Sequence, residues 1–478
     1  MIVFQKYRSL LIISILAIVI GLAFAKGELP AIIFSIAIIF AFIFLLYALK
    51  NPTFPLKIAF IFSFFAIGLT RYIDAPIGLG IDFLLVLTWI VVGLKKNKNF
   101  EWKNAQNFSV LFVVCWFTYI FLQLFNPESL GAEPWFYAMR GMALYPLLIL
   151  PLFYILLNKK TDISWMIKTW FIISILAAIK AFVQKYIDCD SYEKIWLAQG
   201  GAVTHVLFGQ LRAFSFYSDA GQFGAAMSHA SLSSFILFTG PYSKWKKIIL
   251  FVLFILFFWG YLVSGTRGAI AVFVGGFVLF LFLSKNFKLL IYGGLMISAF
   301  YFFMAFTTIG QGNNEIRRLR TAFTAGTEDA SMIVRIENQK KLKVFLADKP
   351  FGGGVGSAGD WGKRFNPDSV LANIATDSYY VRIWSETGIV GLSILLIFFF
   401  YFIIRGAYII WNIKDLNHRN KLLALYCGVV GIMVASYSNS VFSQFPTSLI
   451  CYASMCFIFL AERELGLMKE NKSLQNKK

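Results

Sequence analysis

Long apolar runs separated by short polar connectors dominate the hydropathy pattern of this chain. Runs of about 16–22 residues are long enough to cross a bilayer as helices. They are unbroken rather than alternating, which excludes a transmembrane β-barrel. The pattern predicts an all-α polytopic membrane protein with about 12–14 transmembrane helices. The candidate spans are residues 9–25, 31–49, 55–70, 78–94, 108–125, 141–157, 165–185, 221–240, 247–263, 268–284, 288–307, 388–405, 422–440 and 446–461.

The composition agrees with a chain that faces lipid over most of its length. Hydrophobic residues make up 59% and charged residues 14%, whereas soluble domains average about 25% charged residues. We therefore expect a single transmembrane domain over residues 1–478, with no separable soluble domain. The first run, 9–25, is followed at once by another span, so we interpret it as a retained anchor rather than a cleaved signal peptide.

The distribution of lysine predicts the orientation in the membrane. Every second connector is rich in Lys, as in residues 95–103, which carry Lys95, Lys96, Lys98 and Lys103. Such connectors face the cytoplasm, so the net charge of +20 indicates membrane topology and not nucleic-acid binding. This orientation predicts a bacterial cytoplasmic (inner) membrane protein with both termini in the cytoplasm. It places two long connectors outside, at residues 186–220 and 308–387.

The stretch "FGGGVGSAGDW" (351–361) contains the spacing of a dinucleotide-binding fingerprint, with Gly354, Gly356 and Gly359. That fingerprint needs a preceding β-strand, but the preceding stretch has a helical period and ends at Pro350. We interpret it as a glycine-rich turn that lets backbone segments pack closely, or as a loop that faces substrate. The cysteines show no metal-binding or disulfide spacing, and we expect neither a metal nor another cofactor.

The outer connectors are unusual because they carry arginine where the inner ones carry lysine. A guanidinium binds phosphate oxygens through two parallel hydrogen bonds, which an ammonium cannot do. An anionic, membrane-anchored ligand such as a lipid diphosphate fits this pattern, and contact with lipid headgroups is the alternative. The candidate substrate-binding residues are Arg140, Arg212, Arg267, Arg335 and Arg382. We expect Arg317, Arg318 and Arg320 to form a solvated cluster.

Two carboxylates, Asp377 and Glu386, are expected at the outer mouth of span 388–405. A carboxylate facing arginines at a membrane boundary is a candidate general base. The alternatives are a helix N-cap for Asp377 and a structural ion pair for Glu386. Lys180 and His229 are expected within spans, where an ionisable group suggests function, although an interhelical hydrogen bond explains a lone histidine equally well.

Four stretches, "RAFSFYSDAGQFGA" (212–225), "SGTRGA" (264–269), "RIENQKKLKVFLADKPFGGGVGS" (335–357) and "TDSYYVRIWSETGIVGL" (376–392), carry a resemblance. Together with the long outer loop near the C-terminus, they resemble the O-antigen ligase and O-antigen polymerase superfamily. The resemblance implies a GT-C-like bacterial glycosyltransferase that uses undecaprenyl-diphosphate-linked glycans as donor and acceptor. It also implies inverting, metal-independent chemistry, with membrane lipids around the protein and a chain-length regulator as a further partner.

The resemblance also bears on the type of transfer. Ligases of the superfamily carry His-Asn where this chain has Asp377-Ser378, and polymerase-type members often have Asp. The chain is therefore expected to polymerise oligosaccharide repeat units of an O-antigen, capsule or exopolysaccharide. Ligase-type transfer to a lipid or protein acceptor remains the alternative within the superfamily. From another class, a polytopic transporter or flippase would need internal repeats with broken helices at mid-membrane.

Overall fold

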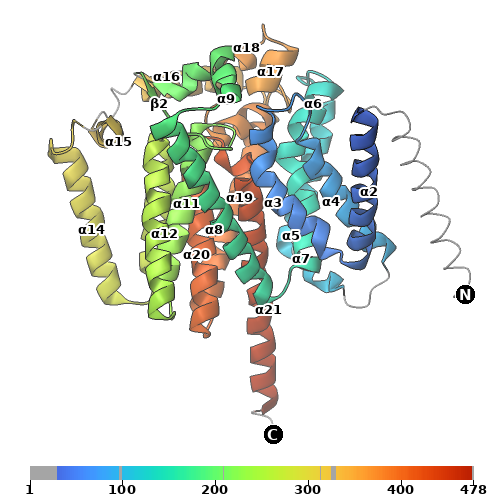
Figure 1. Cartoon of the computed structure of the whole chain (residues 1–478), viewed down its shortest axis with the longest axis vertical. Helices are drawn as coiled ribbons and strands as arrows, with labels where there is room; N and C mark the ends of the chain where they lie inside the picture. Colours follow the sequence, from blue (N-terminus) through green and yellow to red (C-terminus); the bar gives the residue numbers. More distant parts are fainter. Residues whose placement is uncertain (1–28, 96–99, 208, 313, 325–329, 476–478) are drawn as a thin grey trace, which may run out of the picture.

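The computed structural model describes residues 29–95, 100–207, 209–312, 314–324 and 330–475. Helices dominate these residues, and the two strands among them, β1 (Val206–Leu207) and β2 (Gln210–Leu211), form one short antiparallel hairpin. In Figure 1 the long helices run side by side in one bundle. The prediction of an all-α polytopic membrane protein is therefore confirmed.

Six of the described helical segments are long and apolar enough to cross a membrane. They are Phe108–Phe125 (α5 and η2), Ala132–Leu156 (α6, η3 and α7), Lys160–Ile187 (α8 and η4), Lys244–Val263 (α12), Phe287–Phe306 (α14) and Tyr379–Asn412 (α19). Shorter or more polar helices complete the bundle: α2 (Leu29–Lys50), α3 (Thr53–Leu69), α4 (Leu79–Leu94), α11 (Ala220–Phe238), α13 (Ile270–Leu283), α20 (Leu416–Ala435) and α21 (Thr447–Gln475). The candidate span 9–25 lies outside the described residues, and every other candidate span overlaps one of these helices.

Helix α11 forms the centre of the bundle. Almost all of its residues are buried, and it packs against α12, α13 and α20. Its sequence, "AGQFGAAMSHASLSSFILF", is rich in glycine, alanine and serine. Small residues let helix backbones approach closely inside a membrane, where the lipid supplies no hydrophobic driving force between helices. This explains why α11 is buried although it is less apolar than the outer helices.

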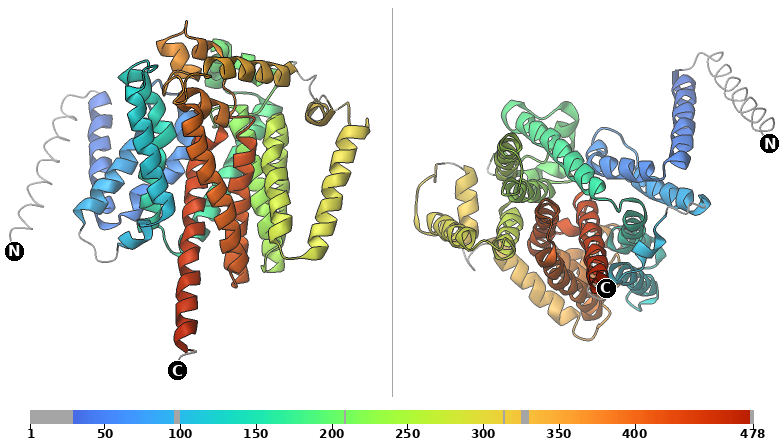
Figure 2. Two further views of the ribbon diagram at one scale, coloured as in Figure 1. Left: turned by 180° about the vertical axis from the view of Figure 1, so that it is seen from behind. Right: turned by 90° about the horizontal axis from the view of Figure 1, so that it is seen from below.

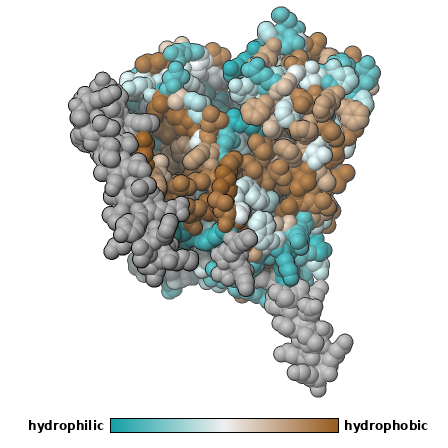
Figure 3. Space-filling view, turned by 90° about the vertical axis from the view of Figure 1, so that its right-hand side faces the viewer, coloured by the Kyte–Doolittle hydropathy of each residue, from teal (hydrophilic) through white to brown (hydrophobic). Residues whose placement is uncertain are grey.

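The outer helices expose large hydrophobic side chains. Phe83 and Ile90 on α4 and Leu295 and Phe302 on α14 are all more than half exposed. On the face shown in Figure 3, apolar side chains form a belt between more polar upper and lower parts. Such a surface would be costly in water and suits contact with lipid tails.

The two long connectors gather at the same end of the bundle, which we call the loop face (Figures 1 and 2). One contributes α9 (Ser191–Trp196), α10 (Ala202–His205) and the hairpin; the other contributes α15 (Asn314–Thr324), α16 (Ala330–Phe345), α17 (Gly359–Phe365) and α18 (Val370–Asn373). The C-terminal end of α21 lies at the opposite end. The predicted alternation of inner and outer connectors requires the two long connectors to lie on the same side of the membrane.

One helix begins earlier than its apolar run, and another is interrupted where its apolar run begins. The helix expected at 141–157 begins at Ala132, and Arg140 opens a π-helical turn, Arg140–Leu144 (η3), in its interior rather than ending a connector. The helix α19 is interrupted at Gly388 (φ +68°, ψ −170°), where the expected span 388–405 begins, and a shorter helical stretch from Tyr379 precedes this break. Glu386 lies in that stretch, two residues before Gly388, and is fully buried. Both additional helical stretches, from Ala132 and from Tyr379, carry polar residues that do not extend an apolar run.

Candidate active site

The loop between α20 and α21, residues 436–446, lies beside the predicted site residues from several elements. The carbonyl of Ser436 accepts a hydrogen bond from the Tyr379 N–H (2.9 Å), and the carbonyl of Ser438 accepts one from Arg335 Nη2 (3.1 Å). The Ser440 hydroxyl donates to the carbonyl of Asp377 (3.2 Å). The sequence prediction missed this α20–α21 loop because it assigned most of it to spans. Its serines and glutamine in "SYSNSVFSQFP" were the available signal.

Asp377 lies at this loop with its carboxylate open to solvent. Its side chain is 59% exposed, and Oδ2 lies 3.8 Å from Nε of Arg335. Ser378, not Asp377, occupies the N-cap position of α19, and the Ser378 side chain makes no capping hydrogen bond. The structure thus brings Asp377 and Arg335 together, and it does not place Asp377 as the helix cap.

Three arginines converge beside the turn between α12 and α13, and we call Arg212, Arg267 and Arg318 the arginine cluster. A Cβ added at Gly265 would lie 3.5 Å from both the Arg212 and Arg318 side chains. Arg318 and Arg267 line one recess with Thr266. The expectation of a solvated Arg318 is therefore wrong, because α15 folds back onto the α12–α13 turn.

The arginine cluster concentrates positive charge in a partly buried place. Burial, together with the charges of Arg318 and Arg267, lowers the pKa of Arg212 to about 10, while the charge of Asp219 opposes this shift. Burial and the charge of Arg267 also lower the pKa of Arg318. Cations held together against their mutual repulsion attract an anion.

Arg320, which was expected to be solvated as well, is 6% exposed. Its Nη2 donates to the carbonyl of Ile309 (2.8 Å), and its guanidinium lies 5.6 Å from the centre of the Phe303 ring. These contacts hold α15 against the end of α14, so Arg320 has a structural position beside the cluster.

The glycine-rich turn packs against α19, as one of the two sequence interpretations expects. The buried Glu386 carboxylate accepts the Gly356 N–H (3.3 Å) and lies 3.2 Å from Nε of Arg382. The Gly353 N–H donates to the carbonyl of Ser385 (2.9 Å). A methyl group at Gly388, which has φ +68°, would overlap the carbonyl oxygen of Pro350. The contacts of Glu386 fit the structural ion pair left open by the sequence.

Arg140 pairs with Asp82 on α4, and its Nη2 also donates to the Tyr145 hydroxyl (3.1 Å). Together with Arg382 it lines a cavity of about 260 Å³ that also borders the α20–α21 loop. The five predicted arginines therefore divide among three places. Arg212 and Arg267 belong to the arginine cluster, Arg140 and Arg382 to the cavity, and Arg335 lies beside Asp377.

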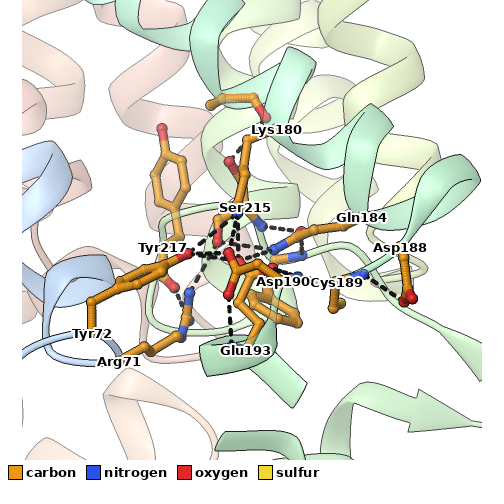
Figure 4. Close-up of polar contacts among 12 residues, drawn as sticks. Arg71, Tyr72, Lys180, Gln184, Asp188, Cys189, Asp190, Glu193, Ser215 and Tyr217 are labelled. Atoms are coloured by element: carbon orange, nitrogen blue, oxygen red, sulfur yellow. Dashed lines mark hydrogen bonds and ion pairs between the residues drawn. The ribbon is translucent and has the colours of Figure 1, made fainter. Parts of the chain in front are cut away.

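A network of polar contacts anchors the connector 188–219 to the bundle (Figure 4). Lys180 lies at the loop-face end of α8, with Nζ 2.8 Å from Asp190 and 3.1 Å from the buried Glu193. Arg71 donates to the carbonyls of Ser215 (2.9 Å) and Ser218 (3.1 Å). The contacts of Lys180 are those of a structural ion pair, and they hold the connector that leads to Arg212.

Neither His205 nor His229 lines the recess of the arginine cluster, although the carbonyl of His205 accepts the Arg212 N–H (2.8 Å). His205 is buried, and its Nε2 accepts the Ala220 N–H (3.2 Å). His229 lies inside α11 with its ring at 4.6 Å from that of Trp170, and its Nε2 has no hydrogen-bond partner in the described structure. Within the described ranges, no three His, Cys, Asp or Glu residues are grouped to hold a metal ion.

Comparisons with known proteins agree with this picture. A sequence model of the O-antigen ligase family matches residues 251–396, which run from α12 to α19 and include Arg267, Arg318, Arg335 and Asp377. The chain is also similar to an O-antigen polymerase from Salmonella muenchen, with 25% identity over 324 residues that cover 66% of this chain and 78% of the relative. Both findings coincide with the resemblance in sequence and with a multi-pass bundle of apolar helices. Residues 251–396 are thus similar to the O-antigen ligase family, and the two comparisons and the apolar helices together support a multi-pass bacterial membrane protein of the O-antigen ligase and polymerase superfamily.

Proposed function

We propose that this protein polymerises undecaprenyl-diphosphate-linked oligosaccharide repeat units at the loop face, and that this face lies outside the cytoplasmic membrane. One observation carries the proposal. The arginine cluster and the exposed Asp377 carboxylate, which come from segments far apart in the sequence, meet around the α20–α21 loop. Ser438 contacts Arg335 and also lies directly against Gly268, the residue after Arg267.

In this proposal the arginine cluster binds the diphosphate of the donor. Cleavage of the sugar–phosphate bond leaves an additional negative charge on the diphosphate, and preorganised cationic donors stabilise that charge in the transition state. Arginine suits the role because its fork can contact two phosphate oxygens at once. The cluster already holds its charges close together, so little reorganisation is needed when the anion forms.

Asp377 is the proposed general base. It removes the proton from a hydroxyl group of the acceptor sugar, and the oxygen attacks the anomeric carbon of the donor. The new glycosidic bond forms as the bond to the diphosphate breaks, with inversion, and the diphosphate leaves with the electron pair. Arg335, 3.8 Å from the carboxylate, orients Asp377. The arginines supply the positive charge in this scheme, so we propose that it runs without a metal ion.

The relative from Salmonella muenchen is named an O-antigen polymerase, and Asp377-Ser378 matches the pattern of polymerase-type members. The matching family model is described as O-antigen ligase, so transfer of a glycan to a lipid or protein acceptor is the second candidate. In the polymerase scheme both termini are cytoplasmic, and a chain-length regulator is a predicted partner. Both candidates use the same base and the same arginine cluster, and they differ in the acceptor.

The test is reconstitution of the purified protein in liposomes with the host's own lipid-diphosphate-linked repeat unit, followed by separation of the products on a gel. A ladder of lengthened lipid-linked glycan is expected from the wild type. Asp377→Asn should abolish it. Asp368→Asn, an exposed carboxylate of the same connector, is the matched control and should leave the ladder unchanged.

Other outcomes separate the alternatives. Transfer to an added lipid or protein acceptor without a ladder would identify a ligase. Movement of the intact substrate across the bilayer without extension would refute the enzyme proposal and favour a flippase. A normal ladder from Asp377→Asn would remove Asp377 from the role of base.

A further inference from the structure

The cavity that holds Arg140 and Arg382 differs in chemistry from the arginine cluster. Its volume is about 260 Å³, slightly below the ~300 Å³ at which pockets for drug-sized ligands begin. It can therefore hold one or two sugar rings and not a whole repeat unit. Its lining comes from α6 and η3, from α17, from the start of α19 and from the α20–α21 loop.

The two arginines of the cavity are already matched by carboxylates. Arg140 pairs with Asp82, and Arg382 pairs with the buried Glu386. Each guanidinium still carries N–H groups that can donate hydrogen bonds. Because each positive charge has a carboxylate beside it, the cavity lacks the net attraction for a diphosphate that the arginine cluster has.

One acceptor in the cavity wall lacks a donor. Oε1 of Gln444 is buried and has no hydrogen-bond partner in the described structure, although Gln444 lines the cavity. A buried polar atom of this kind calls for a ligand or a water that can donate. A sugar hydroxyl both donates and accepts, whereas an ionised diphosphate only accepts.

Aromatic rings form another part of the wall. Tyr137 on α6 and Trp361 on α17 stack with their ring centres 4.8 Å apart and an interplanar angle of 18°. Both line the cavity, as do Tyr145 and Tyr379. Flat aromatic side chains offer apolar area with a polar tip, which matches a sugar ring with C–H groups on its faces and hydroxyls at its edge.

The cavity and the proposed base share two neighbouring segments, the start of α19 and the α20–α21 loop. Tyr379 lines it and lies two residues after Asp377, and its N–H bonds Ser436 of the α20–α21 loop. The same loop contacts Asp377 through Ser440 and lines the cavity through Ser443 and Gln444. A glycan with one ring in the cavity would thus extend toward Asp377.

We propose that this cavity is a binding subsite for an uncharged sugar ring of the acceptor glycan. The assignment of this sugar to the acceptor glycan rests on the proposed function, whereas the binding of a sugar rests on the cavity itself. Arg140, Arg382 and Gln444 bind hydroxyl groups in this subsite, and Tyr137 and Trp361 form its apolar wall. The diphosphate of the donor binds elsewhere, at the arginine cluster.

The test measures binding to the full-length protein in lipid nanodiscs by titration calorimetry. The probe is the host's repeat unit released from its lipid diphosphate by mild acid, so that it carries neither lipid nor phosphate. Trp361→Ala and, as a variant of equal size, Gln444→Met should each weaken binding by about 10-fold. Trp361→Phe should bind close to wild type. Trp245→Ala, an exposed tryptophan at the start of α12, is the control and should bind as wild type.

Competition separates a sugar site from a phosphate site. Sodium pyrophosphate should not displace the oligosaccharide. Displacement by pyrophosphate, wild-type affinity in both Trp361→Ala and Gln444→Met, or no binding of the oligosaccharide at millimolar concentration would each overturn the proposal.

The same variants in the liposome assay distinguish the two proposals. A wild-type ladder with unaffected binding and extension in both variants would refute the subsite and leave the polymerase intact. Binding that depends on Trp361 and Gln444, in a protein that forms no ladder, would support the subsite and refute the polymerase.

Discussion

The planar fork of Arg212 holds the turn that carries Arg267, and replacing it by lysine tests this directly. Nε donates to the carbonyl of Ser264 (3.1 Å), Nη2 to the Thr266 hydroxyl (2.8 Å) and Nη1 to the carbonyl of Thr204 (2.8 Å). Arg212→Lys keeps the positive charge, and therefore the repulsion from its neighbours, but a single ammonium group cannot occupy three nitrogen positions.

The magnitude follows from which of these hydrogen bonds are shielded from water. The bond to Thr204 is exposed, so water replaces it at little cost. The bonds to Ser264 and Thr266 are partly buried, and each should contribute about 1–2 kcal/mol, between the values for neutral and for charged hydrogen bonds because water still reaches part of the group. Opening of the α12–α13 turn should therefore become easier by about 2–4 kcal/mol, or about 30- to 700-fold.

Hydrogen exchange measured by mass spectrometry on the peptide covering residues 262–269 reports this opening. The amides of Gly265 and Ala269 are protected by turn hydrogen bonds to Leu262 and Thr266 and should exchange faster in Arg212→Lys. Arg364→Lys, an exposed arginine on α17, is the control and should leave this peptide unchanged. An acceleration below about threefold, less than ~0.7 kcal/mol, would refute the reasoning that the fork holds the turn.

Three further predictions concern single residues of the loop face. Arg267→Ala should abolish the glycan ladder and Arg267→Lys should restore little of it, because lysine cannot bind phosphate through two parallel N–H groups; near-normal activity of Arg267→Lys would contradict the proposed role. Burial lowers the pKa of His205 below its ordinary 6.5, so the unfolded chain takes up a proton first as the pH falls, and stability should decrease from about pH 7 to pH 5. His205→Gln should flatten this slope in melting temperature, and an unchanged slope would count against the assignment. Glu386→Gln should lower stability by about 1–3 kcal/mol by weakening the Arg382 pair and the Gly356 hydrogen bond, seen as a lower melting temperature, while the folded fraction keeps most of its activity. A stable but inactive Glu386→Gln would instead show that Glu386 takes part in the reaction.

The sequence predicted the membrane bundle well because hydropathy is a local property. A run that crosses the membrane must be about as long as the bilayer is thick, whatever its neighbours are. The runs at 108–125 and 288–307 therefore match α5 and α14. The alternation of lysine-rich connectors likewise predicted that the connectors 186–220 and 308–387 share one side. The early start at α6 and the helical stretch of α19 before its break at Gly388 were missed because their residues are too polar to extend an apolar run.

The candidate site was predictable in its residue types and not in its grouping. Outer arginine and an outer Asp indicated an anionic substrate and a base. The sequence gives no measure of which arginines share a place, because contacts such as that between α15 and the α12–α13 turn join residues about 50 positions apart. Arg318 was therefore assigned to solvent, and Arg140 and Arg382 were grouped with arginines that lie elsewhere.

The amino-acid sequence by itself determined which runs are long and apolar enough for a membrane, the helical class of the fold and the resemblance to the O-antigen ligase and polymerase superfamily. The tertiary structure alone decided that Glu386 is buried against the glycine turn, that Gln444 lacks a donor and that Tyr137 stacks on Trp361. The physical reason is that one property is local in the sequence and the other is not. The free energy of burial in lipid adds up residue by residue along a run, whereas the charge balance and hydrogen bonding of a site depend on side chains that come together only after the helices have packed.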